Sequence, residues 1–262
     1  MIDVREHDIF DLFEKLRAEH LSQTYLRRSK TLLHQAFQKA LANHFVMENP
    51  VSLTARLSSP RKPPCKKPAF NEKEVKILME KLPFNRIGNS MRLMLGTGMR
   101  VEEMLALQKE DIAEDGSMIS INKARIRGDK DTAIGPPKTQ SSYREILIPE
   151  NLRPCAIYLR NIDKTFIWDV KLKGWPCDPK TFEKYFTREV GKIEGVRVLN
   201  PSSCRETFIS QMQALKVDMP TIQSFTGQTK ESTTKSYLRV QQSIKQDAVK
   251  QFNEHFCKSI GV

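Results

Sequence analysis

Apolar residues recur at helical spacing through the first part of the chain. Ser22 is suited to cap the start of a second helix there. Pro50 follows Asn49 and is expected to end the run, because the residue before a proline disfavours helical geometry. The pattern therefore predicts helices over residues 6–47. Their apolar faces are formed by Ile9, Leu12, Phe13 and Leu16, and then by Tyr25, Leu32, Leu33, Phe37, Ala40 and Leu41.

Composition shifts abruptly after this helical region. The stretch RLSSPRKPPCKKPAF, residues 56–70, holds four prolines and five basic residues. Proline at this density cannot continue a helix or a central strand, and it favours an extended, fairly stiff linker. We therefore expect a helical domain at 1–55, a basic linker at 56–69 and a second domain at 70–262. The linker either lies along a nucleic-acid backbone or is a solvated tether.

The periodicity of the second domain changes from helical to alternating and back. Asn71 and Glu74 have the spacing of a helix N-cap and its third helical position, and NSMRLMLGTG continues the helical pattern. After Ile112, SMISINKARI and YREILIP alternate as strands do, with RGDKDTAIGPPKTQ as a long turn between them. From 152 onward the pattern is mostly helical. The expected class is mainly α with a small antiparallel β-sheet, which we expect to have three strands.

The net charge of the chain is more informative about function than its length. The 262 residues carry a formal net charge of +12, with a pI near 9.5. Such an excess serves solubility or marks a polyanionic partner such as nucleic acid. No apolar run approaches the ~18 residues of a membrane span, and the N-terminus lacks the order of a secretory signal. Five scattered cysteines without a C-x-x-C pair suit reduced thiols, and we expect a cytoplasmic protein.

Histidines are confined to the two ends of the chain. None lies between Phe45 and Glu254, so a histidine-based metal site or a Ser-His-Asp triad in the main body is not expected. The histidines are His7, His20, His34, His44 and His255.

The segment LGTGMRVEEM places an arginine at the first turn of a helix. Gly98 allows a sharp turn there, Thr97 can cap nearby amides, and Arg100 follows at a position that the helix dipole makes unfavourable for a cation. The guanidinium can grip two phosphate oxygens. The alternative is an ion pair with Glu102, Glu103 or another acid.

Two further segments add a second arginine and a tyrosine. Arg205 also opens a helix after a proline, in NPSSCRETF, and Tyr237 follows a glycine turn and a Ser/Thr-rich stretch. The two arginines and the tyrosine can converge on one phosphodiester.

These segments, in this order, resemble the motifs of the tyrosine recombinases, the phage-integrase class of site-specific DNA recombinases. GTGMRVEEMLALQKEDI resembles the T-G-x-R-x-x-E-x-x-x-L…D-I box, SSCRETF the H-x-x-R-H-T-F box, and FTGQTKESTTKSY the L-G-H-x-x-x-x-T-T-x-x-Y box. GPPKTQSSYREILIP resembles the hairpin of the catalytic lysine. The resemblance covers essentially the whole chain. It implies as catalytic residues Arg100, Arg205, Tyr237 and Lys138, with Lys130 as the alternative lysine.

The sequence departs from the family pattern at its histidines. Ser202 and Glu206 replace the two histidines around the second arginine, and Gln228 replaces the later one. Serine and glutamine can donate hydrogen bonds to a phosphate but cannot shuttle a proton near neutral pH. A general acid–base group is typically worth about 10²–10⁴ in rate, so such a loss slows an enzyme without abolishing its activity. Glu206 is expected to point away and pair with a cation.

The resemblance implies an enzyme that cuts and rejoins DNA through a 3′-phosphotyrosyl intermediate. It implies a helical core-DNA-binding domain, an α+β catalytic domain and a homotetramer on two double-stranded DNA sites, without metal or other cofactor, encoded by a bacterium, phage or mobile element. Two alternatives remain: a catalytically weakened or inactive DNA-binding relative, and a topoisomerase of the same chemistry. The tail at 241–256 has helical spacing and docks either on a neighbouring subunit or on its own domain.

Overall fold

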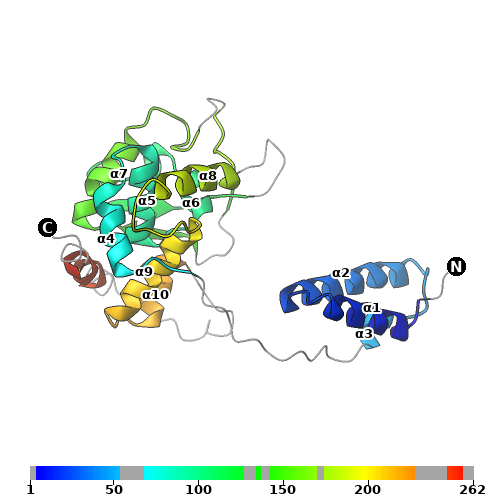
Figure 1. Ribbon diagram of the computed structural model, residues 1–262. Coiled ribbons are helices and arrows are strands. Elements are labelled where there is room, and N and C mark those ends of the chain that lie inside the picture. Colours follow the sequence, from blue (N-terminus) through cyan, green and yellow to red (C-terminus); the bar gives the residue numbers. More distant parts are fainter. Residues whose placement is uncertain are drawn as a thin grey trace. The chain divides into compact units, whose positions relative to one another are not determined.

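The computed structural model describes residues 4–53, 68–126, 134–136, 142–169, 174–227 and 247–255. The chain divides into two compact units, Met1–Cys65 and Lys66–Val262, and the division falls within the proline-rich stretch (Figure 1). The described elements are mainly helical, with short antiparallel strands, as the sequence predicts.

The first unit contains α1 (Glu6–Ala18), α2 (Gln23–Ala42) and the short α3 (Pro50–Leu53). Ser22 caps α2 as expected, its hydroxyl accepting a hydrogen bond from the amide of Tyr25. The small core is formed by Ile9, Phe13, Leu26 and Val51.

The predicted limits and apolar faces of these helices are partly wrong. The helix expected to reach residue 47 ends at Ala42, and Pro50 begins α3 rather than ending α2, because proline fits the first position of a helix. Tyr25 and Leu32 are 52% and 68% exposed, and Leu12 is 39% exposed. The core of this unit is small, and Leu26 is buried in it instead of its neighbour Tyr25.

The second unit is built around α5, whose residues Ile87 to Thr97 are all buried. α5 packs against α4, α6, α7, α8 and α9. Asn71 and Glu74 form the predicted capping box of α4. The helices are α4 (Glu72–Lys81), α5 (Arg86–Thr97), α6 (Val101–Ala106), α7 (Arg153–Arg160), α8 (Pro179–Val190), α9 (Ser202–Ala214) and α10 (Met219–Thr226), with 3₁₀ turns at Lys109–Asp111 and Glu150–Leu152.

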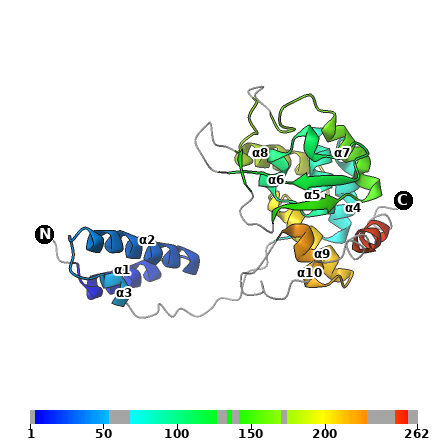
Figure 2. The same cartoon turned by 180° about the vertical axis from the view of Figure 1, so that it is seen from behind.

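Among the described residues, the strands form two antiparallel pairs instead of the expected three-stranded sheet. β1 (Met118–Ile121) pairs with β4 (Arg144–Leu147), and Figure 2 looks onto this pair. β2 (Ala124–Arg125) pairs with β3 (Ile134–Gly135). β3 lies inside the segment that the sequence analysis assigned to a long turn, because its two residues are too few to show an alternating pattern.

The described part of the tail packs on its own unit, which is one of the two alternatives that the sequence left open. Residues 247–255 are helical, and Ala248 and Phe252 are buried. The rings of Phe252 and Phe208 lie 5.2 Å apart between centroids. The tail helix therefore covers α9, the helix that carries Arg205 (Figure 1).

We expect Phe252→Ala to destabilise the protein by about 3–5 kcal/mol, because it leaves a cavity beneath the tail helix. Chemical denaturation followed by circular dichroism measures the loss. Lys250→Ala on the exposed side of the same helix is the matched control and should change stability by less than about 0.5 kcal/mol. Equal stability of the two variants would contradict the packing described above.

Candidate DNA-cleavage site

The turn between α5 and α6 brings the first predicted arginine into position. Gly98 adopts φ of 65°, in the left-handed region that glycine favours, and ends α5 as the sequence predicts. A Cβ at this position would lie 2.5 Å from the ring of Phe208 on α9. The Thr97 hydroxyl donates mainly to the carbonyl of Leu93, at 2.6 Å, and only weakly caps the amide of Met99, at 3.5 Å. The chain then enters α6 with Arg100 as its N-cap.

Arg205 lies in the first turns of α9 and is 7% exposed. Its Nη1 donates to the Gly98 carbonyl at 2.7 Å, and its Nη2 donates to the Thr226 carbonyl at 2.6 Å. Among the described residues it forms no ion pair. Burial lowers its pKa to about 9, and the positive charge of Arg100 contributes to the shift. The guanidinium is thus charged at neutral pH, and within the described part of the chain no carboxylate lies in ion-pair contact with it, although the charges of Glu103 and Glu206 favour its charged form.

Arg100 makes the ion pair that the sequence analysis left open as an alternative. Its Nη1 lies 2.7 Å from Oε1 of Glu103, and its Nη2 donates to the carbonyl of Gly227 at 2.8 Å. About a third of its side chain, 33%, remains exposed. The carboxylate therefore orients the guanidinium and leaves part of it open to solvent.

Glu103 is shared with Arg144, an arginine at the start of β4 that the sequence analysis did not identify as a site residue. Nη1 and Nη2 of Arg144 bind Oε1 and Oε2 of Glu103 at 3.0 and 2.8 Å. Burial opposes the ionisation of Glu103, but the hydrogen bonds and charges of Arg144 and Arg100 outweigh it and lower its pKa. The carboxylate is therefore ionised at neutral pH.

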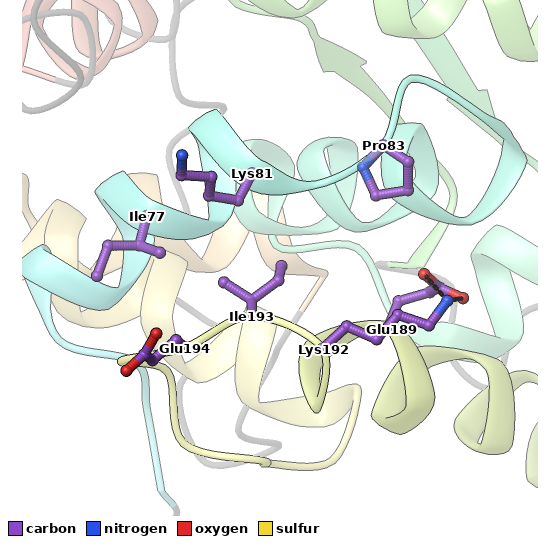
Figure 3. Close-up of a pocket in the computed structure, with 7 residues that line it drawn as sticks. All are labelled: Ile77, Lys81, Pro83, Glu189, Lys192, Ile193 and Glu194. Carbon is purple, nitrogen blue, oxygen red and sulfur yellow. Dashed lines mark hydrogen bonds and ion pairs between the residues drawn. The ribbon is translucent and has the colours of Figure 1, made fainter.

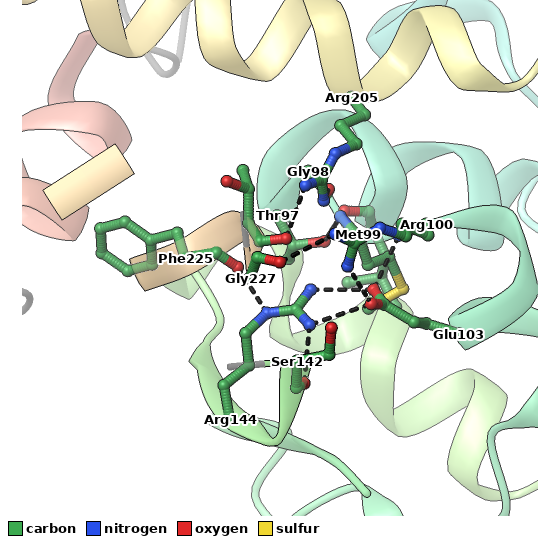
Figure 4. Close-up of polar contacts among 12 residues, drawn as sticks. Thr97, Gly98, Met99, Arg100, Glu103, Ser142, Arg144, Arg205, Phe225 and Gly227 are labelled. Carbon is green, nitrogen blue, oxygen red and sulfur yellow. Dashed lines mark hydrogen bonds and ion pairs between the residues drawn. The ribbon is translucent and has the colours of Figure 1, made fainter. Parts of the chain in front are cut away.

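The C-terminal end of α10 joins all three arginines (Figure 4). Consecutive carbonyls of Phe225, Thr226 and Gly227 accept hydrogen bonds from Arg144, Arg205 and Arg100, respectively. These carbonyls lie at the negative end of the helix dipole, which favours nearby cations. The carbonyls fix the guanidiniums in one cluster, from α5–α6, β4 and α9.

The other predicted site residues are placed only in part. Ser202 is the exposed first residue of α9, and Glu206 is half-buried one position after Arg205. The remaining positions lie outside the described residues, namely Lys138, its alternative Lys130, Gln228 and Tyr237.

A hollow of about 410 Å³ lies elsewhere, between α4 and the turn after α8 (Figure 3). It shares no lining residue with the arginine cluster. Lys192 on its wall is neutralised by Glu189 at 2.9 Å, and the lining combines no nucleophile with a base. Its lining residues are Ile77, Lys81, Pro83, Glu189, Lys192, Ile193 and Glu194.

The described residues contain no group of three or more His, Cys, Asp and Glu side chains arranged to hold a metal ion. Within the same residues, no helix has the length and apolar character needed to cross a membrane.

Comparison with known proteins identifies the class to which this architecture belongs. The model of the phage integrase family matches residues 69–243. The chain belongs to the phage integrase family. Among the curated members of this family, tyrosine recombinase XerA of Pyrococcus furiosus is 30% identical over 252 residues, covering 94% of this chain and 80% of the relative. Tyrosine recombinase XerD of Staphylococcus saprophyticus is 25% identical and covers 83% and 72%.

Integrases are also found among the solved structures that share the fold. The Tn1549 transposon integrase in complex with circular intermediate DNA has a TM-score of 0.69 at 18% identity, covering 95% of this chain and 85% of that one. A lambda integrase dimer bound to a core site has a TM-score of 0.58 at 16% identity, covering 91% and 84%. The family and its relatives make this phage-integrase member a tyrosine-type site-specific DNA recombinase.

Proposed function

We propose that Arg100 and Arg205 bind the two non-bridging oxygens of the DNA phosphodiester that is cut. The observation that carries this proposal is the buried, charged Arg205 without an ion-pair partner among the described residues, beside a second, partly exposed arginine. Fixed guanidiniums stabilise the charge that develops on the oxygens during attack and need no reorganisation at that moment. Bidentate arginine–phosphate geometry adds orientation to charge.

The chemistry follows from the residues that the family motifs match. The Tyr237 oxygen attacks phosphorus and gives up its proton, because an isolated phenol has a pKa of about 10. The bond between phosphorus and the 5′-oxygen breaks, Lys138 protonates that oxygen, and a 3′-phosphotyrosyl ester remains. Ser202 and Gln228 donate hydrogen bonds to the same phosphate. A 5′-hydroxyl from a partner strand then reverses the step, so the bond energy is conserved without a nucleotide cofactor or metal.

The partner is double-stranded DNA, for which the net charge of +12 is suited. Of the two solved relatives named above, the Tn1549 transposon integrase is in complex with circular intermediate DNA, and the lambda integrase dimer is bound to a core site. Residues 1–55 are proposed as the core-DNA-binding domain, 56–69 as the linker and 70–262 as the catalytic domain. The proposed assembly is a homotetramer on two DNA sites, in the cytoplasm of a bacterium or of the host of a phage or mobile element.

A second candidate function is DNA binding with weakened or lost cleavage. Serine at 202 and glutamine at 228 favour it, because neither side chain transfers a proton near neutral pH. The arginine cluster disfavours it, since a DNA-binding protein has no need for a buried cation at one phosphate.

Wild-type protein is expected to form a covalent complex with a nicked duplex. The nick lets the cleaved fragment diffuse away, so that the ester cannot be resealed and accumulates. Duplexes are selected from a random pool by binding, nicked near the centre, and the complex is read on a denaturing gel. Binding without any adduct supports the second candidate. Relaxation of supercoiled plasmids of unrelated sequence supports a topoisomerase.

A further inference from the structure

Arg144 belongs to none of the residues assigned so far to catalysis, yet it contacts more of the site than either proposed phosphate ligand. Resting on the proposed function, we propose that Arg144 is a positioning residue that neutralises Glu103 and thereby leaves the charges of Arg100 and Arg205 available to the DNA phosphate.

The contacts of Arg144 favour a role through other residues over a direct role on DNA, because its charge already faces a carboxylate. The Arg144 side chain is only 4% exposed and that of Glu103 only 2% exposed. Both terminal nitrogens of Arg144 are used on the two oxygens of the carboxylate, and its Nε donates to the carbonyl of Phe225 at 2.6 Å. Nη1 also donates to the carbonyl of Ser142 at 3.1 Å. Arg144 therefore acts through other residues.

Charge balance shows what this arrangement achieves. The cluster holds three guanidiniums, of Arg100, Arg144 and Arg205, and one buried carboxylate, of Glu103. Arg144 binds both oxygens of Glu103, so its charge offsets that of the carboxylate, while Arg100 keeps a single contact to the same carboxylate. The two remaining cations face a phosphate with a charge of one, so the site binds its anion strongly. Without Arg144, the negative charge of Glu103 would neutralise the positive charge of Arg100 or Arg205 instead.

Hydrogen-bond geometry gives the same result. With Arg144 bound to both carboxylate oxygens, Arg100 reaches Glu103 with Nη1 alone and keeps Nη2 on the Gly227 carbonyl. If Arg144 is removed, both oxygens of Glu103 are left without their strongest partner. A bidentate pair between Arg100 and Glu103 then becomes favourable, and it draws the guanidinium away from the phosphate.

The test is a set of variants measured in single-turnover cleavage at saturating DNA. Arg144→Met is expected to cleave about 10² more slowly, in line with the loss of one preorganised cation. Arg144→Lys retains the charge and should stay within about tenfold of wild type. The double variant Glu103→Gln with Arg144→Met restores two uncompensated cations, so it should cleave faster than Arg144→Met alone. A DNA substrate with a neutral methylphosphonate at the cut position should erase most of the difference between Arg144→Met and wild type.

The control removes an arginine of the same kind from another place. Arg160 donates to the carbonyls of Lys109 and Ile112 and pairs with Glu114. Arg160→Met should leave cleavage unchanged even if it lowers the melting temperature. Thermal denaturation of every variant distinguishes a loss of folded protein from a loss of cleavage rate. If Arg144→Met does not fold, the cleavage rates of Arg144→Lys and of the double variant still test the inference.

Three results would overturn the inference while wild-type cleavage upholds the proposed function. The first is a cleavage rate of Arg144→Met equal to that of wild type. The second is an Arg144→Lys variant that cleaves as slowly as Arg144→Met. The third is a double variant that cleaves more slowly than Arg144→Met alone. Absence of cleavage by wild type on every selected duplex would instead refute the proposed function itself.

Discussion

Replacing Tyr237 with phenylalanine is expected to abolish the covalent complex with nicked DNA. The substitution removes the oxygen that we propose as the nucleophile and keeps the ring, so the fold and DNA binding should be unaffected. We expect cleavage to fall at least about 10³-fold, as for loss of a nucleophile in other enzymes. A denaturing gel measures the adduct, and a gel-shift titration measures binding.

The matched control for this prediction is Tyr143→Phe. Tyr143 directly precedes Arg144 and is 45% exposed, which makes it a second phenol next to the arginine cluster. Tyr143→Phe should retain the adduct. If the adduct instead persists in Tyr237→Phe and disappears in Tyr143→Phe, the nucleophile assigned from the motif is wrong.

Arg205→Ala is expected to show the second largest loss, with cleavage about 10²–10³ slower. The alanine variant removes the one buried cation of the cluster that has no carboxylate partner among the described residues, and with it a charge that we propose to stabilise the scissile phosphate. Binding to the duplex should weaken far less, because many phosphate contacts share that energy. Single-turnover kinetics at saturating DNA isolate the cleavage step from binding.

Two companion variants make the result specific. Arg205→Lys cannot donate to the Gly98 and Thr226 carbonyls with the same geometry, and burial disfavours the charged form of lysine, so it should recover only part of the rate. Arg160→Ala, which removes a guanidinium bound to two other carbonyls, should cleave normally. If Arg205→Ala cleaves at the wild-type rate, Arg205 is a structural residue only.

The fold class was predictable because local patterns determine most of its elements. Asn71 and Glu74 form a capping box, and Gly98 takes the left-handed turn, as their spacing predicts. Local patterns do not show which side chains a small core leaves exposed, and Tyr25 and Leu32 were misplaced for that reason. Nor does a two-residue strand such as β3 carry enough alternation to be recognised.

The residues of the candidate site also divide into those that the sequence predicts and those that only the tertiary structure shows. Arg100 and Arg205 were found because family motifs mark them, and the structure brings both to the end of α10. Arg144 was missed because in sequence it is one charged residue in an alternating strand. Its partners, Glu103 and Phe225, are 41 and 81 positions away, so only the tertiary fold reveals the pairing. Glu103 lies within the first motif, but nothing in the sequence indicates that its carboxylate pairs with two arginines.

The contact between Gly98 and Phe208 limits how chimeric recombinases can be assembled from this chain. The turn that presents Arg100 fits against an aromatic ring three residues after Arg205, and its carbonyl also accepts a hydrogen bond from that arginine. A graft that exchanges residues 95–106 for those of a homologue, without exchanging α9 as well, would mismatch these two surfaces and misalign both guanidiniums. The two segments have to be transplanted together, although about a hundred positions separate them along the polypeptide.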